Sequence, residues 1–256
     1  MFKELKNKVA LVTGATSGIG YSTAIKFAEL GAKVFITGRN EEKLKELNNK
    51  LKDQTDSEYL PGDLSDQGFR ESLIKNVLTK FSSLDVLVNS AGIIGSGSIE
   101  DTPMEEYDRM MDINLRSIFH LIQLSIPHLE KTKGNIINIS SITGLRAFPG
   151  VISYCISKAG LDQLTRSAAL ELAPKKIRVN AINPGVVETK LHLNSGMNTE
   201  KYEQFKEHSK ETHPIGRIGK PTEVADLIIF LASDSAAWIT GVTYSIDGGR
   251  QLTCAR

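Results

Sequence analysis

Short apolar segments alternate with amphipathic segments along the whole chain, and this alternation constrains the fold more than any other feature. The apolar segments are rich in Val, Ile and Leu, which is typical of strands buried on both faces of a sheet. They predict strands at residues 9–12, 33–37, 57–60, 85–89, 135–140, 177–182 and 242–246. The amphipathic segments predict helices at about 18–30, 41–52, 66–80, 104–131, 152–173 and 221–233.

Alternating strands and helices predict right-handed βαβ units and a parallel sheet between two helix layers. We therefore expect an α/β fold with a doubly wound sheet of seven parallel strands. The 256 residues contain no repeat or linker, so one domain spanning residues 1–256 is expected. Residues 188–220 exceed an ordinary connection, which predicts a substrate-binding segment, although a solvated surface helix is an alternative.

Composition and charge exclude several classes of protein. With 31 basic and 30 acidic residues, the chain has a formal net charge of +1, so neither nucleic acid nor an acidic membrane surface is an expected partner. No signal peptide or membrane-spanning run is evident, so we expect a cytoplasmic protein. The two cysteines and five histidines have no metal-ligand spacing, and no metal site is expected.

A glycine-rich turn follows the first predicted strand. Gly14, Gly18 and Gly20 have the spacing G-x-x-x-G-x-G and open the next predicted helix. Glycines let a backbone approach a pyrophosphate closely, and the N–H groups at a helix start meet its charge. This turn predicts a dinucleotide site, and a glycine turn without a ligand is the alternative.

The residues after the second and third strands indicate how the dinucleotide is recognised. NAD sites usually carry a carboxylate after the second strand, whereas an Arg there accommodates the 2′-phosphate of NADP. This chain has Gly38 and then Arg39, which predicts NADP(H) over NAD(H), unless Arg39 merely begins a polar loop. Asp63 follows the third strand and is predicted either to accept from the adenine amino group or to cap a helix.

Two further segments follow predicted strands and are expected at the same pocket. Small residues at 89–92 would let the chain pass close to the adenine ribose. The backbone of Val187 and the hydroxyl of Thr189 could bind the nicotinamide carboxamide. Ligands of open α/β sheets collect at the carboxyl ends of the strands, where all these segments lie.

Tyr154 and Lys158 are four residues apart in a predicted helix, so their side chains share one face. An ammonium beside a phenol favours the phenolate, and we expect the pKa of Tyr154 to be lowered toward neutrality. Ser141 follows a predicted strand and could bring a hydroxyl to the same point. The three residues predict acid–base chemistry on one substrate oxygen, whereas an ordinary surface helix is the alternative for the Tyr–Lys pair alone.

Taken together, these motifs resemble the short-chain dehydrogenase/reductase family, in its single-domain branch of about this length. The resemblance covers nearly the whole chain and implies a Rossmann-type fold with helices on both faces of the sheet. It rests on TGATSGIG at 13–20, NSAG at 89–92, Asn114, Ser141, the Tyr154–Lys158 pair, PGVVET at 184–189 and IDGG at 246–249. Ser90 departs from the pattern, because many relatives carry a second Asn there.

The resemblance also implies a role for each site residue. Tyr154 would be the general acid, Lys158 would lower its pKa and bind the nicotinamide ribose, and Ser141, with Ser140 as its rival, would polarise the substrate carbonyl. Asn114 would hold a water that links Lys158 to solvent. The implied cofactor-binding residues are Gly14, Thr16, Ser17, Gly18, Ile19, Gly20, Arg39, Asp63, Leu64, Asn89, Ala91, Gly92, Tyr154, Lys158, Pro184, Gly185, Val187 and Thr189.

The implied activity is an NADP(H)-dependent hydride transfer between nicotinamide and the carbonyl or secondary alcohol of a mainly apolar small molecule. No charged residue is expected at a carboxylate or phosphate of the substrate. The candidate residues of the substrate pocket are Ile94, Ile142, Leu145, Phe148, Leu191, Leu193 and Met197.

Two other functions stay open. A 3-oxoacyl-thioester reductase of fatty acid metabolism would need a basic surface near its entrance for a carrier protein. The basic run Lys175, Lys176 and Arg178 is a candidate, or a solvated turn. A non-catalytic NADP-binding scaffold is the second alternative. The resemblance implies a homotetramer or a homodimer, with residues 104–131 and 152–173 at one interface and 221–250 at another.

Overall fold

The computed structural model describes residues 5–253. The two termini of the predicted domain, residues 1–4 and 254–256, lie outside the described residues. Its strands form one parallel seven-stranded sheet in the order β3-β2-β1-β4-β5-β6-β7. The predicted doubly wound α/β fold is confirmed. The strands are β1 (Val9–Thr13), β2 (Lys33–Gly38), β3 (Ser57–Pro61), β4 (Val86–Asn89), β5 (Asn135–Ile139), β6 (Arg178–Pro184) and β7 (Thr243–Ile246).

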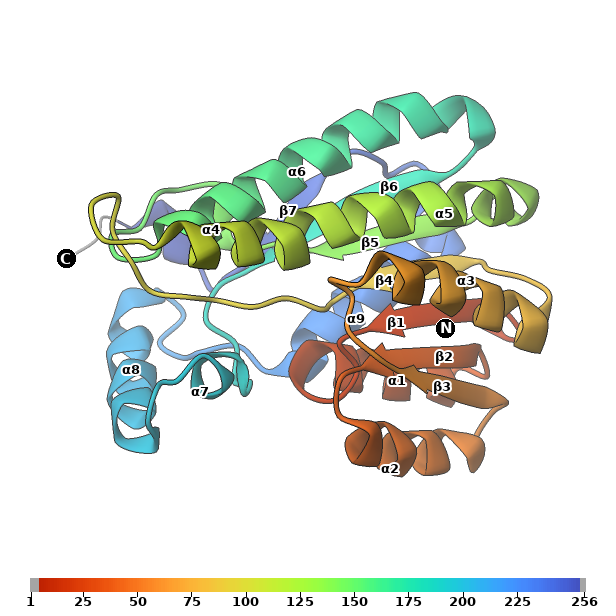
Figure 1. Cartoon of the computed structure of the whole chain (residues 1–256), viewed down its shortest axis with the longest axis horizontal. Coiled ribbons are helices and arrows are strands. Elements are labelled where there is room, and N and C mark those ends of the chain that lie inside the picture. The colour runs from red at the N-terminus through yellow and green to blue at the C-terminus, as the bar shows by residue number, and fades with distance from the viewer. Residues whose placement is uncertain (1–4, 254–256) are drawn as a thin grey trace.

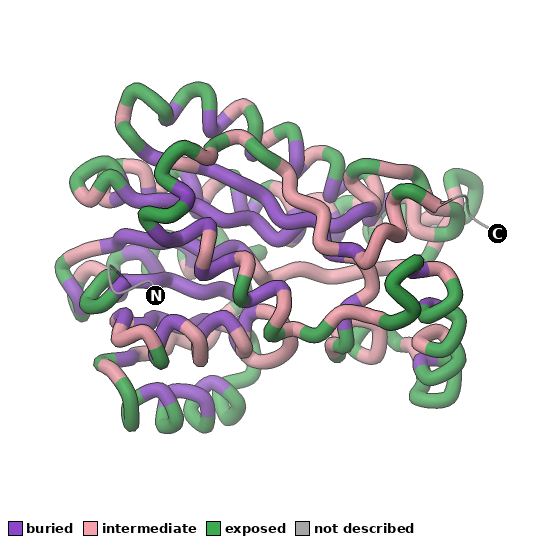
Figure 2. The backbone as a smooth tube through the Cα atoms, turned by 180° about the vertical axis from the view of Figure 1, so that it is seen from behind, coloured by how far each residue is buried: buried purple, intermediate pink, exposed green. Residues whose placement is uncertain are grey.

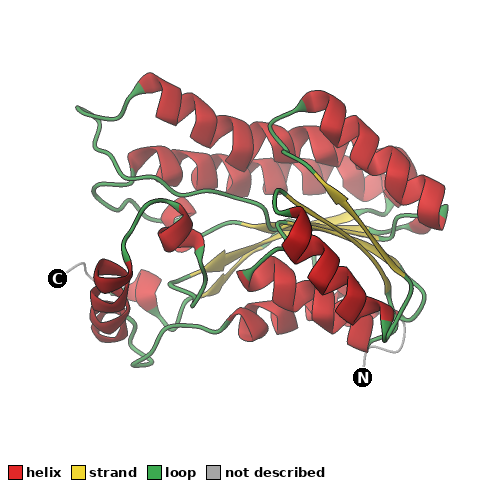
Figure 3. Cartoon of the chain, turned by 60° about the horizontal axis from the view of Figure 1, so that its bottom comes forward, coloured by secondary structure: helices red, strands yellow, loops and turns green. Residues whose placement is uncertain are grey.

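Helices cover both faces of the sheet (Figures 1 and 3). Helices α1 (Gly18–Glu29), α2 (Glu41–Lys52) and α9 (Pro221–Ala232) pack on one face, and α3 (Gln67–Phe81), α5 (Ser117–Thr132) and α6 (Ile152–Leu172) pack on the other. The short 3₁₀ helices are Ile142–Gly144, Ala173–Lys175, Asp234–Ala236 and Arg250–Leu252. None of the helices described within residues 5–253 is long and apolar enough to span a membrane.

The alternation of strand side chains explains why two apolar cores form. Leu11 and Val12 are neighbours in β1 and are both fully buried, but they belong to the cores on opposite faces of the sheet. Figure 2 shows the buried strands at the centre and the exposed helix surfaces around them. A strand covered on both faces therefore requires the continuous apolar runs of the sequence.

The strand order reverses between β1 and β4, because the chain runs outward to β3 and then returns to the other side of β1. Hydrogen bonds connect the carboxyl ends of β1 and β4: Oγ1 of Thr13, the last residue of β1, accepts from the backbone N–H groups of Ser90 and Ala91 after β4, both at 3.1 Å. Such a reversal opens a crevice at the carboxyl ends of the strands. The fold thus places the glycine turn and residues 89–92 side by side.

The helix predicted at 104–131 is interrupted. It consists of α4 (Met104–Met111), a π-helical turn at Asp112–Arg116, and α5. The side chain of Asn114, in the π turn, is bonded to the backbone of Ile93: Oδ1 accepts from the N–H and Nδ2 donates to the C=O, each at 2.9 Å. The π turn, with its one extra residue, therefore occurs where the helix contacts the loop after β4. The apolar periodicity of the sequence does not predict this turn.

Residues 188–220 contain α7 (Leu191–Asn194) and α8 (Thr199–Thr212), which stand together at one end of the molecule (Figure 1). Tyr202 in α8 donates its hydroxyl to the carbonyl of Thr189 at 2.8 Å. His213 accepts from the N–H of Val186 at 3.1 Å through Nε2. Helix α8 is largely exposed and charged on its outer side, as the surface-helix alternative predicted, but its position over the strand ends also suits a substrate segment.

Candidate active site

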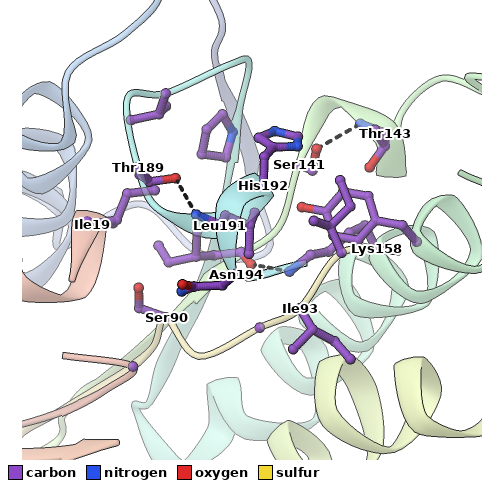
Figure 4. A pocket seen from close by; sticks show the side chains of 18 of the residues that line it. Ile19, Ser90, Ile93, Ser141, Thr143, Lys158, Thr189, Leu191, His192 and Asn194 are labelled. Atoms are coloured by element: carbon purple, nitrogen blue, oxygen red, sulfur yellow. Dashed lines mark hydrogen bonds between the residues drawn. The ribbon is translucent and has the colours of Figure 1, made fainter. Parts of the chain in front are cut away.

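A cavity of about 460 Å³ opens at the carboxyl ends of the strands. Its walls come from the loops after β1 to β6 and from α7 and α8. Figure 4 shows side chains of these segments converging on one space, with Lys158 and Ser141 on one side and Ile19 and Ser90 on the other. The volume lies in the range of small-molecule and cofactor sites.

The glycine turn forms a cradle that larger residues would fill. Gly14 has φ +67°, and a Cβ there would lie 2.7 Å from Ala91 Cα. A Cβ on Gly20 would lie 2.5 Å from the carbonyl oxygen of Gly14. Ser17 precedes α1 without capping it by its side chain, so the first N–H groups of the helix are available to an anion. The cradle therefore fits a pyrophosphate.

The end of β2 leaves no room for a longer side chain beside the cradle. A Cβ on Gly38 would lie 2.8 Å from the Thr16 methyl carbon. Arg39 is exposed and lines the cavity next to it. A guanidinium rather than a carboxylate is thus offered to the ribose that a dinucleotide would place there.

Asp63 also lines the cavity, but it does not cap a helix. Its Oδ1 accepts from the N–H and the hydroxyl of Ser65, both at 2.9 Å, whereas Asp66 is the residue that caps α3. Partial burial would raise the pKa of Asp63, but the Ser65 hydrogen bonds and the charge of Arg39 outweigh it and lower the pKa. The helix-capping alternative is wrong, and Asp63 stays ionised near the predicted adenine position.

Tyr154, Lys158 and Ser141 are brought together as predicted. Their exposed fractions are 7%, 4% and 8%, so all three groups are largely removed from water. Lys158 lies in the turn of α6 after Tyr154, with its Nζ 5.6 Å from the centre of the Tyr154 ring. The Lys158 ammonium donates to the carbonyl of Ile139 at 2.8 Å.

The predicted lowering of the Tyr154 pKa is wrong for this structure. Burial raises the pKa of Tyr154 to about 12, although a side-chain hydrogen bond with Ser141 opposes the rise. Burial also lowers the pKa of Lys158 to about 8, against the charge of Asp162. The helix spacing correctly predicts proximity, but desolvation of the buried phenol decides the direction of its pKa shift. The neutral phenol that results is the proton-donating form.

The geometry distinguishes Ser141 from its rival Ser140. Ser140 directs its hydroxyl to the carbonyl of Lys158 at 3.3 Å, whereas Ser141 is the serine that lowers the pKa of Tyr154 against the effect of burial. Ser141 also accepts from the N–H of Thr143 at 3.2 Å, which fixes its rotamer at the start of a 3₁₀ turn (Figure 4). The strand end therefore presents one hydroxyl to Tyr154 and turns the other toward α6.

A buried carboxylate that sequence reasoning missed lies one turn beyond Lys158. Asp162 is 1% exposed and accepts from Asn183 Nδ2 at 2.8 Å, and the same amide donates to the carbonyl of Ser141 at 2.9 Å. Burial raises the pKa of Asp162, and the hydrogen bond from Asn183 opposes the rise. This pair ties α6 to the Ser141 backbone. Asp162 is four residues after Lys158, and this spacing in a helix could have predicted that the carboxylate lies on the same face.

Three residues of the predicted site lie behind the cavity wall. Gly20 packs on the glycine turn, Asn89 donates to Asn138 Oδ1 at 2.9 Å, and Asn114 is fully buried. Asn114 is nonetheless close to Lys158, since a Cβ on Gly92 would lie 3.2 Å from Asn114 Oδ1 and 3.6 Å from Lys158 Nζ. All the other predicted site residues line the cavity.

The substrate end of the cavity is more polar than predicted. Of the predicted apolar residues, Ile94, Ile142, Phe148 and Leu191 line it, whereas Leu145, Leu193 and Met197 do not. The unpredicted lining residues include His192, Asn194, His208 and Arg250. No short-range pattern marks them, because the fold of residues 188–220 and the chain after β7 brings them there.

The chain matches known proteins over nearly its whole length. A family model described as Enoyl-(Acyl carrier protein) reductase matches residues 14–251. The 3-oxoacyl-[acyl-carrier-protein] reductase FabG of Thermotoga maritima is 38% identical over 254 residues, covering 96% of this chain and 98% of the relative. The FabG of Rickettsia prowazekii is 40% identical over 247 residues, with the same shares covered.

Two solved structures share the fold. A short-chain dehydrogenase/reductase of unknown function from Caenorhabditis elegans, solved with cofactor, has a TM-score of 0.92 and 35% identity, over 98% of this chain and 97% of that chain. A short-chain type dehydrogenase/reductase from Mycobacterium marinum has a TM-score of 0.90 and 30% identity, over 99% and 98%. The glycine cradle, the Ser141–Tyr154–Lys158 cluster and these matches agree, and the chain belongs to the short-chain dehydrogenase/reductase family of oxidoreductases.

Proposed function

We propose that the protein is an NADPH-dependent reductase of 3-oxoacyl thioesters. The observation that carries the proposal is a buried Tyr154, its pKa raised by burial, that lines one cavity with Ser141, Lys158 and the glycine cradle. Relatives of nearly equal length at 38% and 40% identity carry the name 3-oxoacyl-[acyl-carrier-protein] reductase, which favours this substrate class over a general apolar carbonyl.

The chain's own residues supply binding, orientation and a proton. A bound nicotinamide would supply the hydride. Ser141 Oγ holds and polarises the substrate carbonyl oxygen, and Tyr154 Oη donates its proton to that oxygen as negative charge develops there. The Lys158 ammonium stabilises the phenolate that remains and binds the nicotinamide ribose. Asn114 holds a water on the path that returns a proton through Lys158.

Residues 188–220 form the substrate-binding segment in this proposal. Within the segment, Tyr202 of α8 bonds to Thr189, and His213 after α8 accepts a hydrogen bond from Val186 in the loop after β6. His192 and Asn194 of α7 line the cavity above Ser90 (Figure 4). A segment held in this way can exclude water from the reacting carbonyl.

A panel of carbonyl compounds tests the proposal. NADPH and NADH oxidation would be followed with 3-oxoacyl thioesters, simple ketones and aldehydes. The highest kcat/KM is expected for a 3-oxoacyl thioester with NADPH. Faster turnover of simple ketones would favour the general carbonyl reductase, and dinucleotide binding without turnover of any compound would favour the non-catalytic scaffold.

Arg39 is expected to determine the preference for NADPH. Arg39→Ala should raise the Kd for NADPH by about tenfold to a hundredfold and leave the Kd for NADH unchanged, because only the 2′-phosphate requires the guanidinium. Fluorescence titration of the two dinucleotides measures both constants. Lys43→Ala removes an equal charge from nearby α2 and serves as the control. Equal losses for both dinucleotides would contradict the assignment.

Exposed apolar side chains support the proposed homo-oligomer. Phe119 on α5 is 54% exposed, and Ile156 on α6 is 40% exposed, both on the helices predicted for one interface. Trp238 is fully exposed in the region predicted for the other interface. Aromatic side chains such as Phe119 and Trp238 are of the type enriched at the centres of contacts between subunits.

A further inference from the structure

A pair of arginines stands at the substrate end of the cavity, where the sequence predicted no charge. Arg250 lines the cavity, and its guanidinium carbon lies 5.4 Å from the centre of the Phe148 ring, which lines the same wall. The guanidinium carbon of Arg146 lies 6.0 Å from that ring centre. Two cations therefore share one aromatic ring beside the loop that carries Ser141.

Neither arginine has a carboxylate partner in the part of the chain that the structure describes, residues 5–253. The acidic residue closest in sequence, Asp247, is occupied by backbone: its two oxygens accept from the N–H groups of Gly249 and Gln251 at 3.0 and 2.7 Å. Burial and the charge of Arg146 lower the pKa of Arg250. Two like charges in a partly buried place are unfavourable until an anion joins them.

The two arginines have different tasks. Arg146 donates to backbone carbonyls of the chain after β7, including that of Gln251 at 2.6 Å and that of Thr253, and so holds this segment against the cavity. Arg250 uses only Nη1, which donates to Thr253 Oγ1 at 3.1 Å. Its Nε and Nη2 groups are free to bind a ligand, as far as residues 5–253 show.

The basic run at Lys175 and Arg178 offers no such site. Lys175 forms an ion pair with Glu130 at 2.6 Å, and Arg178 donates to the carbonyls of Ser233 and Ile239. Both residues lie before or at the start of β6, whereas the cavity lies at its carboxyl end. The positions and hydrogen bonds of Lys175 and Arg178 therefore do not support a binding surface for a carrier protein at this basic run.

We propose that Arg250, held in place by Arg146, binds an anionic group of the substrate, a carboxylate or a phosphate, while the carbonyl lies at Tyr154. A guanidinium binds either anion with two parallel hydrogen bonds, and the Phe148 ring centre, 5.4 Å from the guanidinium carbon, gives it an apolar neighbour on one side. This specificity rests on the proposed reductase activity but not on the thioester. The anion could be the carboxylate of a free 3-oxo acid or the phosphate of a thioester's carrier arm; these lie at different distances from the carbonyl, and the experiment distinguishes them.

Matched substrate pairs test the role of Arg250. One pair is 3-oxobutanoate and its methyl ester, and the other is 3-oxobutanoyl-CoA and the 3-oxobutanoyl thioester of N-acetylcysteamine. Arg250→Gln should raise KM about tenfold or more for a charged substrate and leave its kcat nearly unchanged, because the lost contact is equally strong in the ground and transition states. The KM and kcat of both neutral substrates should stay nearly unchanged. Arg250→Lys should retain part of the affinity, since it keeps the charge without the planar fork.

The arms of the experiment separate the possible outcomes. An effect confined to the acid identifies a carboxylate, and one confined to the CoA thioester identifies a phosphate. Equal changes for charged and neutral members, or no change for either charged member, would overturn the proposal. Arg166→Gln on the outer side of α6 is the control, and thermal melting verifies that each variant is folded.

Failure of the thioester activity is distinguishable from failure of the anion site. If neither thioester is reduced, the proposed function is wrong, and the site is judged by calorimetric binding of an anion of either kind, 3-oxobutanoate or CoA, in the presence of NADP⁺. Arg250→Gln should then weaken that binding about tenfold. Unchanged binding, or no binding to the wild type, would overturn the anion site by itself.

Discussion

Tyr154→Phe is expected to lower kcat/KM for carbonyl reduction by about 10²–10⁴-fold, because it removes the proton donor and leaves the ring in place. The side chain is 7% exposed and lines the cavity, so the substitution changes the site without changing its packing. Affinity for NADPH should not change, since the glycine cradle and Arg39 are untouched. Steady-state kinetics and a fluorescence titration of NADPH measure the two effects separately.

Tyr21→Phe is the matched control for this substitution. The Tyr21 hydroxyl contacts Lys50 Nζ at 3.2 Å on the surface between α1 and α2, away from the cavity. It should retain full activity. If Tyr154→Phe kept most of its turnover, or if it lost NADPH affinity in parallel, the role of Tyr154 as the general acid would be wrong.

As the pH rises, the rate of reduction should fall when Lys158 loses its proton, before Tyr154 loses its own. With the pKa of Tyr154 at about 12 and that of Lys158 at about 8, both groups are protonated at neutral pH. As the pH rises through about 8, Lys158 loses the charge that stabilises the departing phenolate, so kcat/KM should fall while Tyr154 is still protonated. A profile that stays level until Tyr154 itself titrates would contradict this order.

Gly14→Ala is expected to abolish tight dinucleotide binding and to destabilise the fold. Alanine at φ +67° is strained by roughly 1–2 kcal/mol, and its Cβ would also lie 2.7 Å from Ala91 Cα, so the loop after β4 must move. Because that loop forms one wall of the cradle, the movement should also disturb the pyrophosphate site. Denaturant unfolding and NADPH titration measure the two losses.

Gly216→Ala separates backbone strain from the clash. Gly216 has a similar φ of +77°, but a Cβ there would meet nothing within 4 Å. This control should show the strain alone, with NADPH affinity unchanged. If the two variants lost equal free energy of unfolding, and Gly14→Ala still bound NADPH normally, the close approach of the glycine turn to Ala91 would have no functional importance.

The sequence predicted those features whose cause is local. Continuous apolar runs predicted the buried strands, since a strand covered on both faces needs them, and the structure differs from the predicted ranges only by one or two residues at most ends. The glycine spacing predicted the cradle because only glycine permits the close approach at Gly14. The four-residue spacing of Tyr154 and Lys158 predicted their shared face from helix geometry alone.

Only the tertiary structure decided the electrostatics and the substrate end of the site. The pKa of Tyr154 rises because surrounding elements remove it from water, and no pattern within α6 contains that information. The π turn at Asn114 accompanies contacts with Ile93, and Arg250 reaches the cavity because Arg146, over a hundred residues earlier in the chain, holds its segment. Burial and contacts between distant residues arise from packing of the whole chain, whereas periodicity and spacing are fixed by the backbone geometry of each element.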